Sequence, residues 1–424
     1  MDVARFGDYA SPQYGTIKSS ENYERRFIMT FPNETLPKGR KQKTTALYDH
    51  FVEQGAVMGD AFGLENVLWF AKNKEDAHEE PTIKRSRSHN YVSKEVINVR
   101  ENVGVIEVAN FSKHEFKGPD ARKFLDYVMA GRLPKPGRIS LTPMLTKKGK
   151  LYGDLTVACM NENDFMIFGS GAAQEMHRRW FESHLEKFNL QYKNRSDEFH
   201  GLGIAGPKSR DLLQKIVREN VSNDKFKFRD SRRMYVAGVP AIVNRLSFTG
   251  ELGYEIYVAP HFQIKLYEEL LEAGKEFNIK PFGSRALMSM RLEKNWGAWT
   301  LDYRPDFTAK ETGLDIFINW DKEFIGKEFA KKDDSKSKIV PLIVETNDID
   351  VTYNEAVMKG DKSIGYVTSG GFAHFVNKSI ALSYLDTKEL NSGKGIQVEI
   401  NGDMFNCSII KDPLYDPGGQ KMRS

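Results

Sequence analysis

Two ten-residue segments of the chain repeat one pattern. Phe116–Leu125 and Ile204–Leu213 each read as the end of a strand, a Gly-Pro pair and an amphipathic helix. Two such units predict a core built from two related halves. Strands elsewhere recur as hairpins and do not alternate singly with helices, so we expect an α+β fold with antiparallel sheets.

A predicted hairpin at Ser247–Tyr257 places one carboxylate among apolar neighbours. Thr249–Gly253 supplies the turn, and Glu255 and Tyr257 share one face of the strand that follows. Burying the Glu255 charge requires strong donors opposite it. Two interpretations stay open: a cross-strand pair with Arg245, or a ligand such as a pterin or guanine ring whose adjacent N–H groups meet both carboxylate oxygens.

A second carboxylate, Asp154, lies in a predicted strand at Leu151–Ala158, after a Gly-containing turn at Lys147–Lys150. Alternation puts Asp154 on the same face as Tyr152. An ordinary solvated strand face explains this pattern. A catalytic role for Asp154 requires a neighbouring binding site.

Together the two segments resemble the aminomethyltransferase family, which comprises the T-protein of the glycine cleavage system and its relatives. There a D-L-x-V strand and a T-G-E-x-G-x-E hairpin line one folate pocket. Further matches in the same order resemble the folate-dependent half of dimethylglycine and sarcosine dehydrogenases, without their FAD-binding half. These matches include Tyr23–Phe27, Pro37–Arg40, Phe111–Lys113, Arg291–Glu293 and Thr368–Gly370.

The resemblance implies a pseudo-duplicated core of the T-protein type, in which antiparallel sheets and helices are followed by a small C-terminal β-barrel. It also implies tetrahydrofolate as the cofactor. Asp154 matches the catalytic aspartate of the family, and Glu255 matches the residue that holds the pterin edge. Ser170 falls where the dehydrogenases carry a serine, and we expect it to touch the pterin or its linker.

Other residues are also candidates for the folate pocket, and some of them differ from the family pattern. Tyr152 and Tyr254 are expected to stack or pack nearby, although strand aromatics usually belong to the core. Phe248 replaces a tyrosine of the family hairpin, which removes one hydroxyl. Leu287 stands where the T-protein has an arginine, and Arg285 is expected to substitute for it.

The chain is long enough for several structural units. We expect an N-terminal arm over 1–97, the two halves of the folate-binding core over 98–195 and 196–330, and the barrel over 331–424. The one G-x-G-x-x-G pattern, Gly201–Gly206, follows polar residues, so we do not expect a dinucleotide-binding domain.

Charge and composition indicate which binding partners the sequence does not favour: nucleic acids, metal ions and membranes. A net charge of +4 is small for 424 residues and gives little support to nucleic-acid binding. Cys159 and Cys407 lack the spacing of a zinc site, and no metal is expected. The polar N-terminus and the lack of long apolar runs predict a cytoplasmic protein without membrane spans.

Three functions follow from the resemblance. The first is transfer of a one-carbon unit to tetrahydrofolate from a methylamine-type donor such as dimethylglycine or sarcosine, with a separate FAD-dependent dehydrogenase as a possible partner. The second is a demethylase that moves an intact methyl group from a sulfonium, ammonium or aryl ether. The third is a folate-binding subunit of a flavoprotein dehydrogenase without chemistry of its own.

Overall fold

The N-terminal part of the chain forms two helices and a hairpin before the first long helix. The computed structural model describes residues 7–390 and 395–424. These elements are α1 (Pro12–Glu24), α2 (Tyr48–Glu53), β1 (Ala56–Ala61), β2 (Leu64–Phe70) and α3 (Ser88–Glu101). Between β1 and β2, Phe62 and Gly63 both have positive φ, as a two-residue hairpin turn requires.

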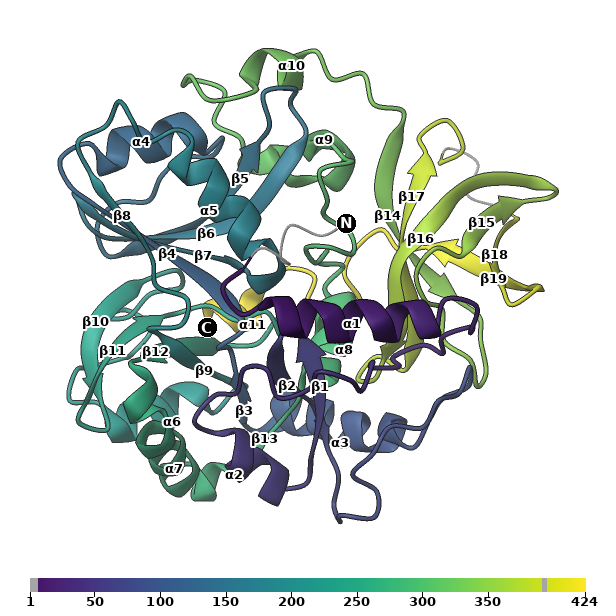
Figure 1. Ribbon diagram of the computed structural model, residues 1–424, viewed down its shortest axis with the longest axis horizontal. Coiled ribbons are helices and arrows are strands. Elements are labelled where there is room, and N and C mark those ends of the chain that lie inside the picture. Colours follow the sequence, from purple (N-terminus) through teal and green to yellow (C-terminus); the bar gives the residue numbers. More distant parts are fainter. Residues whose placement is uncertain (1–6, 391–394) are drawn as a thin grey trace.

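The first large sheet has five antiparallel strands in the order β5-β6-β7-β4-β8. They are β4 (Phe111–Lys117), β5 (Arg138–Leu145), β6 (Leu151–Asn161), β7 (Asp164–Ser170) and β8 (Gln191–Asn194). Two helices, α4 (Ala121–Val128) and α5 (Gln174–Glu182), cover one face (Figure 1). Their apolar residues and those of the strands form a single cluster, which leaves the opposite face for the second sheet.

The second sheet has six strands in the order β10-β11-β12-β9-β3-β13. They are β3 (Gly104–Glu107), β9 (His200–Ala205), β10 (Ser231–Val236), β11 (Val239–Asn244), β12 (Gly253–Val258) and β13 (Lys280–Pro281). Helices α6 (Ser209–Ile216) and α7 (Gln263–Ala273) pack on its outer face. The inner faces of the two sheets meet in one apolar cluster, where Phe168 stacks on Tyr257 with ring centroids 4.6 Å apart.

The repeated pattern of the sequence forms the same local structure twice. In each half a strand, β4 or β9, ends at a glycine with positive φ, and a helix, α4 or α6, follows. A side chain at Gly206 would meet the Val99 and Asn102 carbonyl oxygens at 2.6 and 2.4 Å. The glycines are therefore required by backbone conformation and by close packing. Pro207 lies two residues before the first residue of α6.

Short helices link the core to the C-terminal barrel. They are α8 (Ser284–Glu293), α9 (Ala309–Thr312) and α10 (Lys327–Lys331). The barrel closes in the order β14-β17-β16-β15-β18-β19. Its strands are β14 (Ser337–Val344), β15 (Ala356–Lys359), β16 (Lys362–Ala373), β17 (Lys378–Asp386), β18 (Ile396–Ile400) and β19 (Asp403–Ile409). A final short helix, α11 (Gln420–Arg423), follows.

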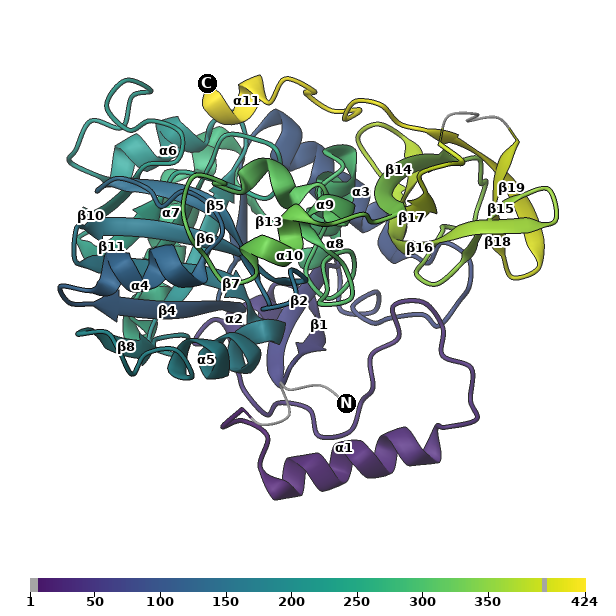
Figure 2. The same ribbon diagram turned by 90° about the horizontal axis from the view of Figure 1, so that it is seen from above.

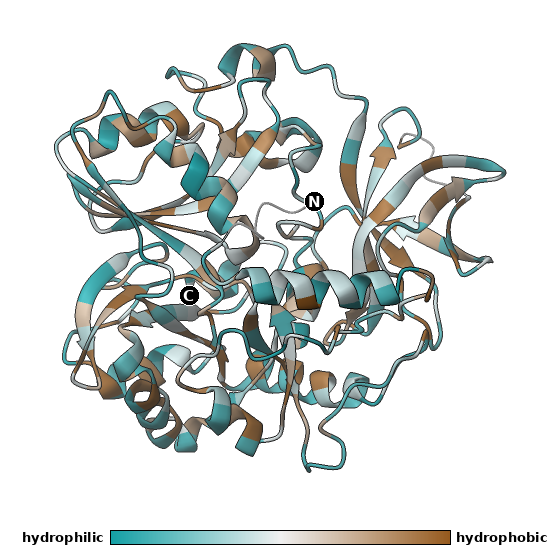
Figure 3. Ribbon diagram, viewed as in Figure 1, coloured by the Kyte–Doolittle hydropathy of each residue, from teal (hydrophilic) through white to brown (hydrophobic). Residues whose placement is uncertain are grey.

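The structure confirms the predicted fold class, with two sheet-and-helix units and a closed barrel. In Figure 3 the brown, apolar segments gather on the strands and on the helices that cover them. The division of the chain at residues 97, 195 and 330 stays a proposal. The structure adds that β3, which precedes the first sheet along the chain, lies in the second sheet between β9 and β13.

Candidate functional site

The hairpin predicted around Glu255 is formed by β11 and β12. The register pairs Asn244 with Glu255 and Ile242 with Tyr257. Tyr254, Ile256 and Val258 pack with the helices on the outer face of the sheet. Tyr257 packs between the two sheets. Because Glu255 shares the face of Tyr257, its carboxylate points toward the first sheet.

Glu255 is nearly buried, with 8% of its surface exposed. The Tyr257 hydroxyl donates a hydrogen bond to Glu255 Oε2 at 2.8 Å, and no residue of the described ranges bonds Oε1. Burial raises the pKa of Glu255 to about 7, although Tyr257 and the Lys113 ammonium lower it. One oxygen of a buried carboxylate is thus free to accept from a ligand.

The predicted pair between Glu255 and Arg245 does not form, and that interpretation was wrong. β11 ends at Asn244, which is the residue opposite Glu255. Arg245 is one residue after Asn244, so its side chain points to a different side of the hairpin from those of Asn244 and Glu255. Its guanidinium donates to Asn223 Oδ1 at 2.6 Å, to the Phe226 carbonyl and to Ser424 O.

Asn244 contributes a second polar group on the inner face of the hairpin. Its side chain is fully buried. The Ser231 hydroxyl donates to Asn244 Oδ1 at 2.7 Å, while Asn244 Nδ2 has no partner within the described residues. Unpaired buried donors are uncommon in proteins, so Asn244 Nδ2 is a second group in this region that can bond a ligand.

A small cavity lies against Glu255. Its free volume is about 20 Å³, which is room for one water molecule. Phe248 lines it and stacks on Trp296, with ring centroids 5.7 Å apart and planes inclined by 24°. The remaining wall is mostly apolar and comes from Ile106, Val108, Phe111, Gly203, Ile204, Ala205, Leu246, Ser247, Thr249, Tyr254 and Leu287.

Asp154 projects from β6 on the facing sheet. It lies on the side of Ala158, which packs between the two sheets. No other residue of the described ranges donates a hydrogen bond to its carboxylate, and burial raises the pKa of Asp154 to about 7. The negative charge of Asp154 helps to raise the pKa of the Tyr303 hydroxyl, which places Tyr303 nearby. Asp154 does not line the cavity beside Glu255.

The rings of the two tyrosines proposed for the pocket, Tyr152 and Tyr254, pack against other parts of the core. β6 has a register shift at Tyr152, where Met144 pairs with Gly153 and Leu145 with Leu151. This shift turns the Tyr152 ring toward α5, where it lies 4.6 Å from Trp180 between ring centroids. The Tyr254 side chain is fully buried in the outer core beside Phe226. Tyr254 does line the cavity beside Glu255, although its ring packs in the outer core. Contact of either tyrosine with a ligand stays a prediction.

Ser170 ends β7, two residues after Phe168 on the inner face. It pairs across the sheet with Phe111, which lines the cavity near Glu255. This placement puts Ser170 at the edge of the space between the sheets. Its contact with a ligand stays a prediction.

Arg285 does not substitute for an arginine at Leu287. Two residues on a helix are separated by about 200° of rotation, so Arg285 and Leu287 lie on nearly opposite sides of α8. Leu287 lines the cavity. The Arg285 guanidinium pairs with Glu79 at 2.9 Å and donates to Ser88 Oγ at 2.8 Å.

Three neighbours of the two carboxylates were not among the predicted site residues: Tyr257, Lys113 and Tyr303. Tyr257 could have been found, since it lies two residues after Glu255 in the same strand. Lys113 is fully buried, and burial lowers its pKa to about 7. Lys113 lies in the first sheet and Glu255 in the second. No sequence pattern therefore predicted that these two side chains would lie close together.

Across residues 7–390 and 395–424, no three acidic, histidine or cysteine side chains come close enough together to bind a metal ion. Nor do these residues include a helix with the length and apolar character needed to cross a membrane.

Family models match nearly the whole chain. The GCVT N-terminal domain matches residues 47–322, and the glycine cleavage T-protein C-terminal barrel domain matches residues 338–416. Residues 1–45 match a third model, the FAD dependent oxidoreductase central domain.

Curated proteins and solved structures agree with these matches. The mitochondrial dimethylglycine dehydrogenase of Homo sapiens is 34% identical over 98% of this chain. The chain spans 49% of that protein's length. The aminomethyltransferase of Caldanaerobacter subterraneus is 31% identical over 76% of this chain and 87% of its own length. The crystal structure of aminomethyltransferase T from Bartonella henselae superposes with a TM-score of 0.77 at 21% identity, covering 88% of this chain and 98% of that one.

Proposed function

The chain belongs to the glycine cleavage T-protein family, and we propose that it transfers a one-carbon unit from a methylamine-type donor to tetrahydrofolate. The observation that carries this proposal is the buried Glu255 carboxylate, which lines a small cavity and has one oxygen bonded to Tyr257 and the other without a partner among the described residues. The family relationship supports the folate; the donor is inferred from the similarity to dimethylglycine dehydrogenase.

The residues present fit a pterin ring chemically. A carboxylate that accepts from adjacent N–H groups matches the amino and ring N–H edge of a pterin. Phe248 and Trp296 offer flat apolar surfaces beside it. A cavity of about 20 Å³ is smaller than the ring, so binding requires the side chains at its edge, such as Phe248 and Leu287, to move aside.

Asp154 has the properties of a base in this proposal. Bound tetrahydrofolate supplies nucleophilic nitrogens that accept carbon at the formaldehyde level. Asp154 has no competing donor from another residue of the described ranges, and its pKa of about 7 lets it take a proton near neutral pH. When ionised, the carboxylate also stabilises a cationic donor, because its charge is only partly screened by solvent. The main task of Asp154 is to act on the folate and the donor after binding has brought them together.

An FAD-dependent dehydrogenase is the proposed source of the oxidised one-carbon unit. The match of residues 1–45 to an FAD dependent oxidoreductase domain supports this partner class. Direct transfer of a methyl group without oxidation remains the second candidate, and a non-catalytic folate-binding subunit the third. A cytoplasmic location also remains a proposal.

The product of the reaction distinguishes these functions. Dimethylglycine or sarcosine with isotope-labelled methyl groups is supplied with tetrahydrofolate and a flavoprotein that oxidises the amine, and the folate products are resolved by mass spectrometry. Labelled methylenetetrahydrofolate, formed faster with the chain than without it, supports the proposal. Labelled methyltetrahydrofolate formed without the flavoprotein supports the demethylase. Equal rates with the wild type and Asp154→Asn support the non-catalytic subunit.

A further inference from the structure

Lys113, in β4, carries a buried ammonium without an acidic partner. Its side chain is fully buried. The ammonium donates to the Ala109 carbonyl at 2.8 Å and to the Ser196 carbonyl at 3.4 Å, and it forms no ion pair within the described ranges of the chain. Burying a charge without an opposite charge beside it is costly, because the interior replaces water poorly. We therefore expect the charge itself to have a role.

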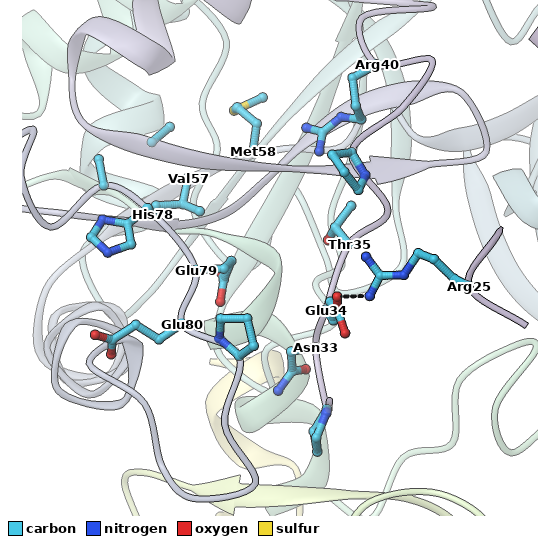
Figure 4. Close-up of a pocket in the computed structure, with 15 residues that line it drawn as sticks. Arg25, Asn33, Glu34, Thr35, Arg40, Val57, Met58, His78, Glu79 and Glu80 are labelled. Carbon is cyan, nitrogen blue, oxygen red and sulfur yellow. Dashed lines mark hydrogen bonds and ion pairs between the residues drawn. The ribbon is translucent and has the colours of Figure 1, made fainter. Parts of the chain in front are cut away.

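The charged groups that line a larger cavity, by contrast, have ionic partners. This cavity, of about 390 Å³, lies between residues 25–40, β1 and residues 77–81, and Figure 4 shows Arg25 and Glu34 joined at one side of it. Figure 2 shows helix α1, which precedes this segment in the chain, at the edge of the molecule and away from both sheets. The other arginine and glutamates of the cavity are also paired: Arg40 with Glu65, Glu79 with Arg285 and Glu80 with Arg87.

Lys113 and Phe168 together hold the ring of Tyr257 from the opposite sheet. The two residues pair directly across β4 and β7, so their side chains lie on the same face of the first sheet. Phe168 stacks on the Tyr257 ring, and the Lys113 ammonium lies 5.8 Å from the centre of that ring. A cation at this distance over an aromatic face attracts the ring. The first sheet therefore fixes where Tyr257 lies in the second.

Tyr257 in turn fixes Glu255, through the hydrogen bond from its hydroxyl to Glu255 Oε2 at 2.8 Å. The Lys113 ammonium also acts on this carboxylate through space. Burial raises the pKa of Glu255, and the Tyr257 hydrogen bond and the Lys113 charge oppose that rise. Both effects favour the ionised carboxylate, which is the form that accepts from two N–H groups.

Other charged groups surround Lys113 and affect its protonation. Burial lowers the pKa of Lys113 to about 7, and the acidic neighbours Asp197 and Glu107 oppose this most. The amine is thus charged below about pH 7, and its effect on Glu255 is lost as pH rises above that value. The titratable groups that interact with this charge are Glu107, Asp197, Glu255, Lys43, His114 and His200.

We propose that Lys113 is a positioning residue of the folate site, which holds the Tyr257 ring in place and keeps Glu255 charged for the N–H groups of the pterin. This inference rests on the proposed function. Lys113 does not line the cavity beside Glu255, so it acts through Glu255 and not by touching the folate. If Lys113 only joined the Ala109 and Ser196 carbonyls, its loss would change stability and not the ionisation of Glu255.

A double-mutant cycle tests whether Lys113 acts through Glu255. Tetrahydrofolate affinity is measured by calorimetry at about pH 6.5 for the wild type, Lys113→Met, Glu255→Gln and the double variant. We expect Lys113→Met to weaken binding about five- to tenfold when Glu255 is present and less than about twofold when it is absent. Lys193→Met, at an exposed lysine of β8, should bind as the wild type does. Effects of Lys113→Met that are equal in both backgrounds overturn the proposal.

The pH dependence of binding separates a loss of charge from a loss of packing. Wild-type affinity is expected to rise with pH as Glu255 ionises. In Lys113→Met the midpoint of this rise should lie about one pH unit higher, so that the two proteins converge near about pH 9. Lys113→Arg keeps the charge and should keep the wild-type midpoint. Binding by Lys113→Met that is weaker by the same factor at every pH contradicts the proposal.

Direct titration of Glu255 without folate distinguishes failure of this inference from failure of the proposed function. Glutamate is labelled with ¹³C at its carboxyl carbon, and the Glu255 signal is identified by its loss in Glu255→Gln. The pKa read from this signal is expected to be higher in Lys113→Met than in the wild type, and an equal pKa overturns the inference. A higher pKa in a protein that does not bind tetrahydrofolate supports the action of Lys113 on Glu255 and contradicts the folate as the ligand.

Discussion

Asp154 and Glu255 are two carboxylates whose pKa burial raises to about 7, yet their surroundings differ. Glu255 accepts a hydrogen bond from Tyr257, which fixes its orientation. Asp154 has no donor from another side chain of the described residues and so can exchange a proton. This difference assigns binding to Glu255 and proton transfer to Asp154 within the proposed function.

The pKa of Asp154 predicts a pH dependence of turnover. The base form exists above the pKa, so kcat is expected to rise with pH and to level off above about 7. Asp154→Asn should lower kcat strongly, leave folate affinity within about threefold, and remove this ionisation from the profile. Stopped-flow or steady-state assays from about pH 5 to about pH 9 measure it. An ionisation near the ordinary aspartate pKa of about 4, unchanged in Asp154→Asn, contradicts the assignment.

The pKa of Asp154 also predicts how the stability of the protein depends on pH. Turnover is expected to rise with pH, whereas the contribution of Asp154 to stability falls. The pKa of Asp154 is higher in the folded protein than in the unfolded chain, so its contribution is favourable below the unfolded pKa and is lost as pH rises to about 7. Asp154→Asn is expected to stabilise the protein by roughly 1–2 kcal/mol at about pH 8, after allowance for its partial exposure, and not below about pH 4. Thermal unfolding at both pH values measures the difference.

The exposed Asp306 provides the control for this stability measurement. It is 72% exposed in its pair with Arg304, so Asp306→Asn should change stability by less than about 0.5 kcal/mol at either pH. A destabilised Asp154→Asn at about pH 8 would show that the carboxylate has a structural partner.

At the scale of elements, the segment 294–303 connects the barrel with the neighbourhood of Asp154. Its anchor is Asp302, which is fully buried. Arg291 pairs with Asp302 Oδ2 at 2.7 Å, and the hydroxyls of Thr368 and Ser369 donate to Oδ1 at 2.6 and 2.7 Å. These contacts hold Tyr303, the residue that follows Asp302, beside Asp154.

Removing this anchor should affect both stability and activity. Asp302→Ala leaves the Arg291 guanidinium buried without its partner, which typically costs about 3–5 kcal/mol. Asp306→Ala, four residues away and exposed, should cost less than about 0.5 kcal/mol. Chemical denaturation measures both free energies. At temperatures where the Asp302 variant is folded, its turnover is expected to fall more than its folate affinity; equal stability of the two variants contradicts the role of Asp302.

Local sequence patterns predicted several elements and missed specific contacts. The Gly-Pro repeat predicted two strand-to-helix units because glycine and apolar spacing act within a few residues. The shift at Tyr152 was not predicted, because it depends on how β6 pairs with β5. Of the two interpretations of Glu255, the pair with Arg245 was wrong for a similar reason: the hairpin was identified, but β11 ends at Asn244 and the loop begins at Arg245.

At the scale of the whole molecule, the cavity beside Glu255 is assembled from distant parts of the chain. Its walls come from residues 106–111, 203–205 and 246–255, and from Leu287. Figure 1 shows that these walls come from both sheet units, because β4 belongs to the five-stranded sheet and β3, β9 and β12 belong to the six-stranded sheet. From the sequence, family resemblance predicted only Phe248, Tyr254 and Glu255 among these wall residues. The residue pattern alone left Glu255 and Asp154 as two unrelated carboxylates.

The barrel adds further contacts across the molecule. The Ser289 hydroxyl on α8 donates to the Phe372 carbonyl in β16 at 2.9 Å, and the Phe375 N–H donates to Glu293 Oε1 at 2.9 Å. Because α8 also carries Leu287 at the cavity, the barrel helps to hold one wall of the proposed folate pocket.

The most direct test of the account is calorimetric titration of the purified protein with tetrahydrofolate. Glu255→Gln is compared with the wild type and with Glu323→Gln, whose carboxylate is 87% exposed. The account predicts binding by the wild type and by Glu323→Gln, and a loss of about 1.5–3 kcal/mol, or roughly 10- to 150-fold, for Glu255→Gln. Equal affinity of all three proteins would contradict a folate pocket built around Glu255.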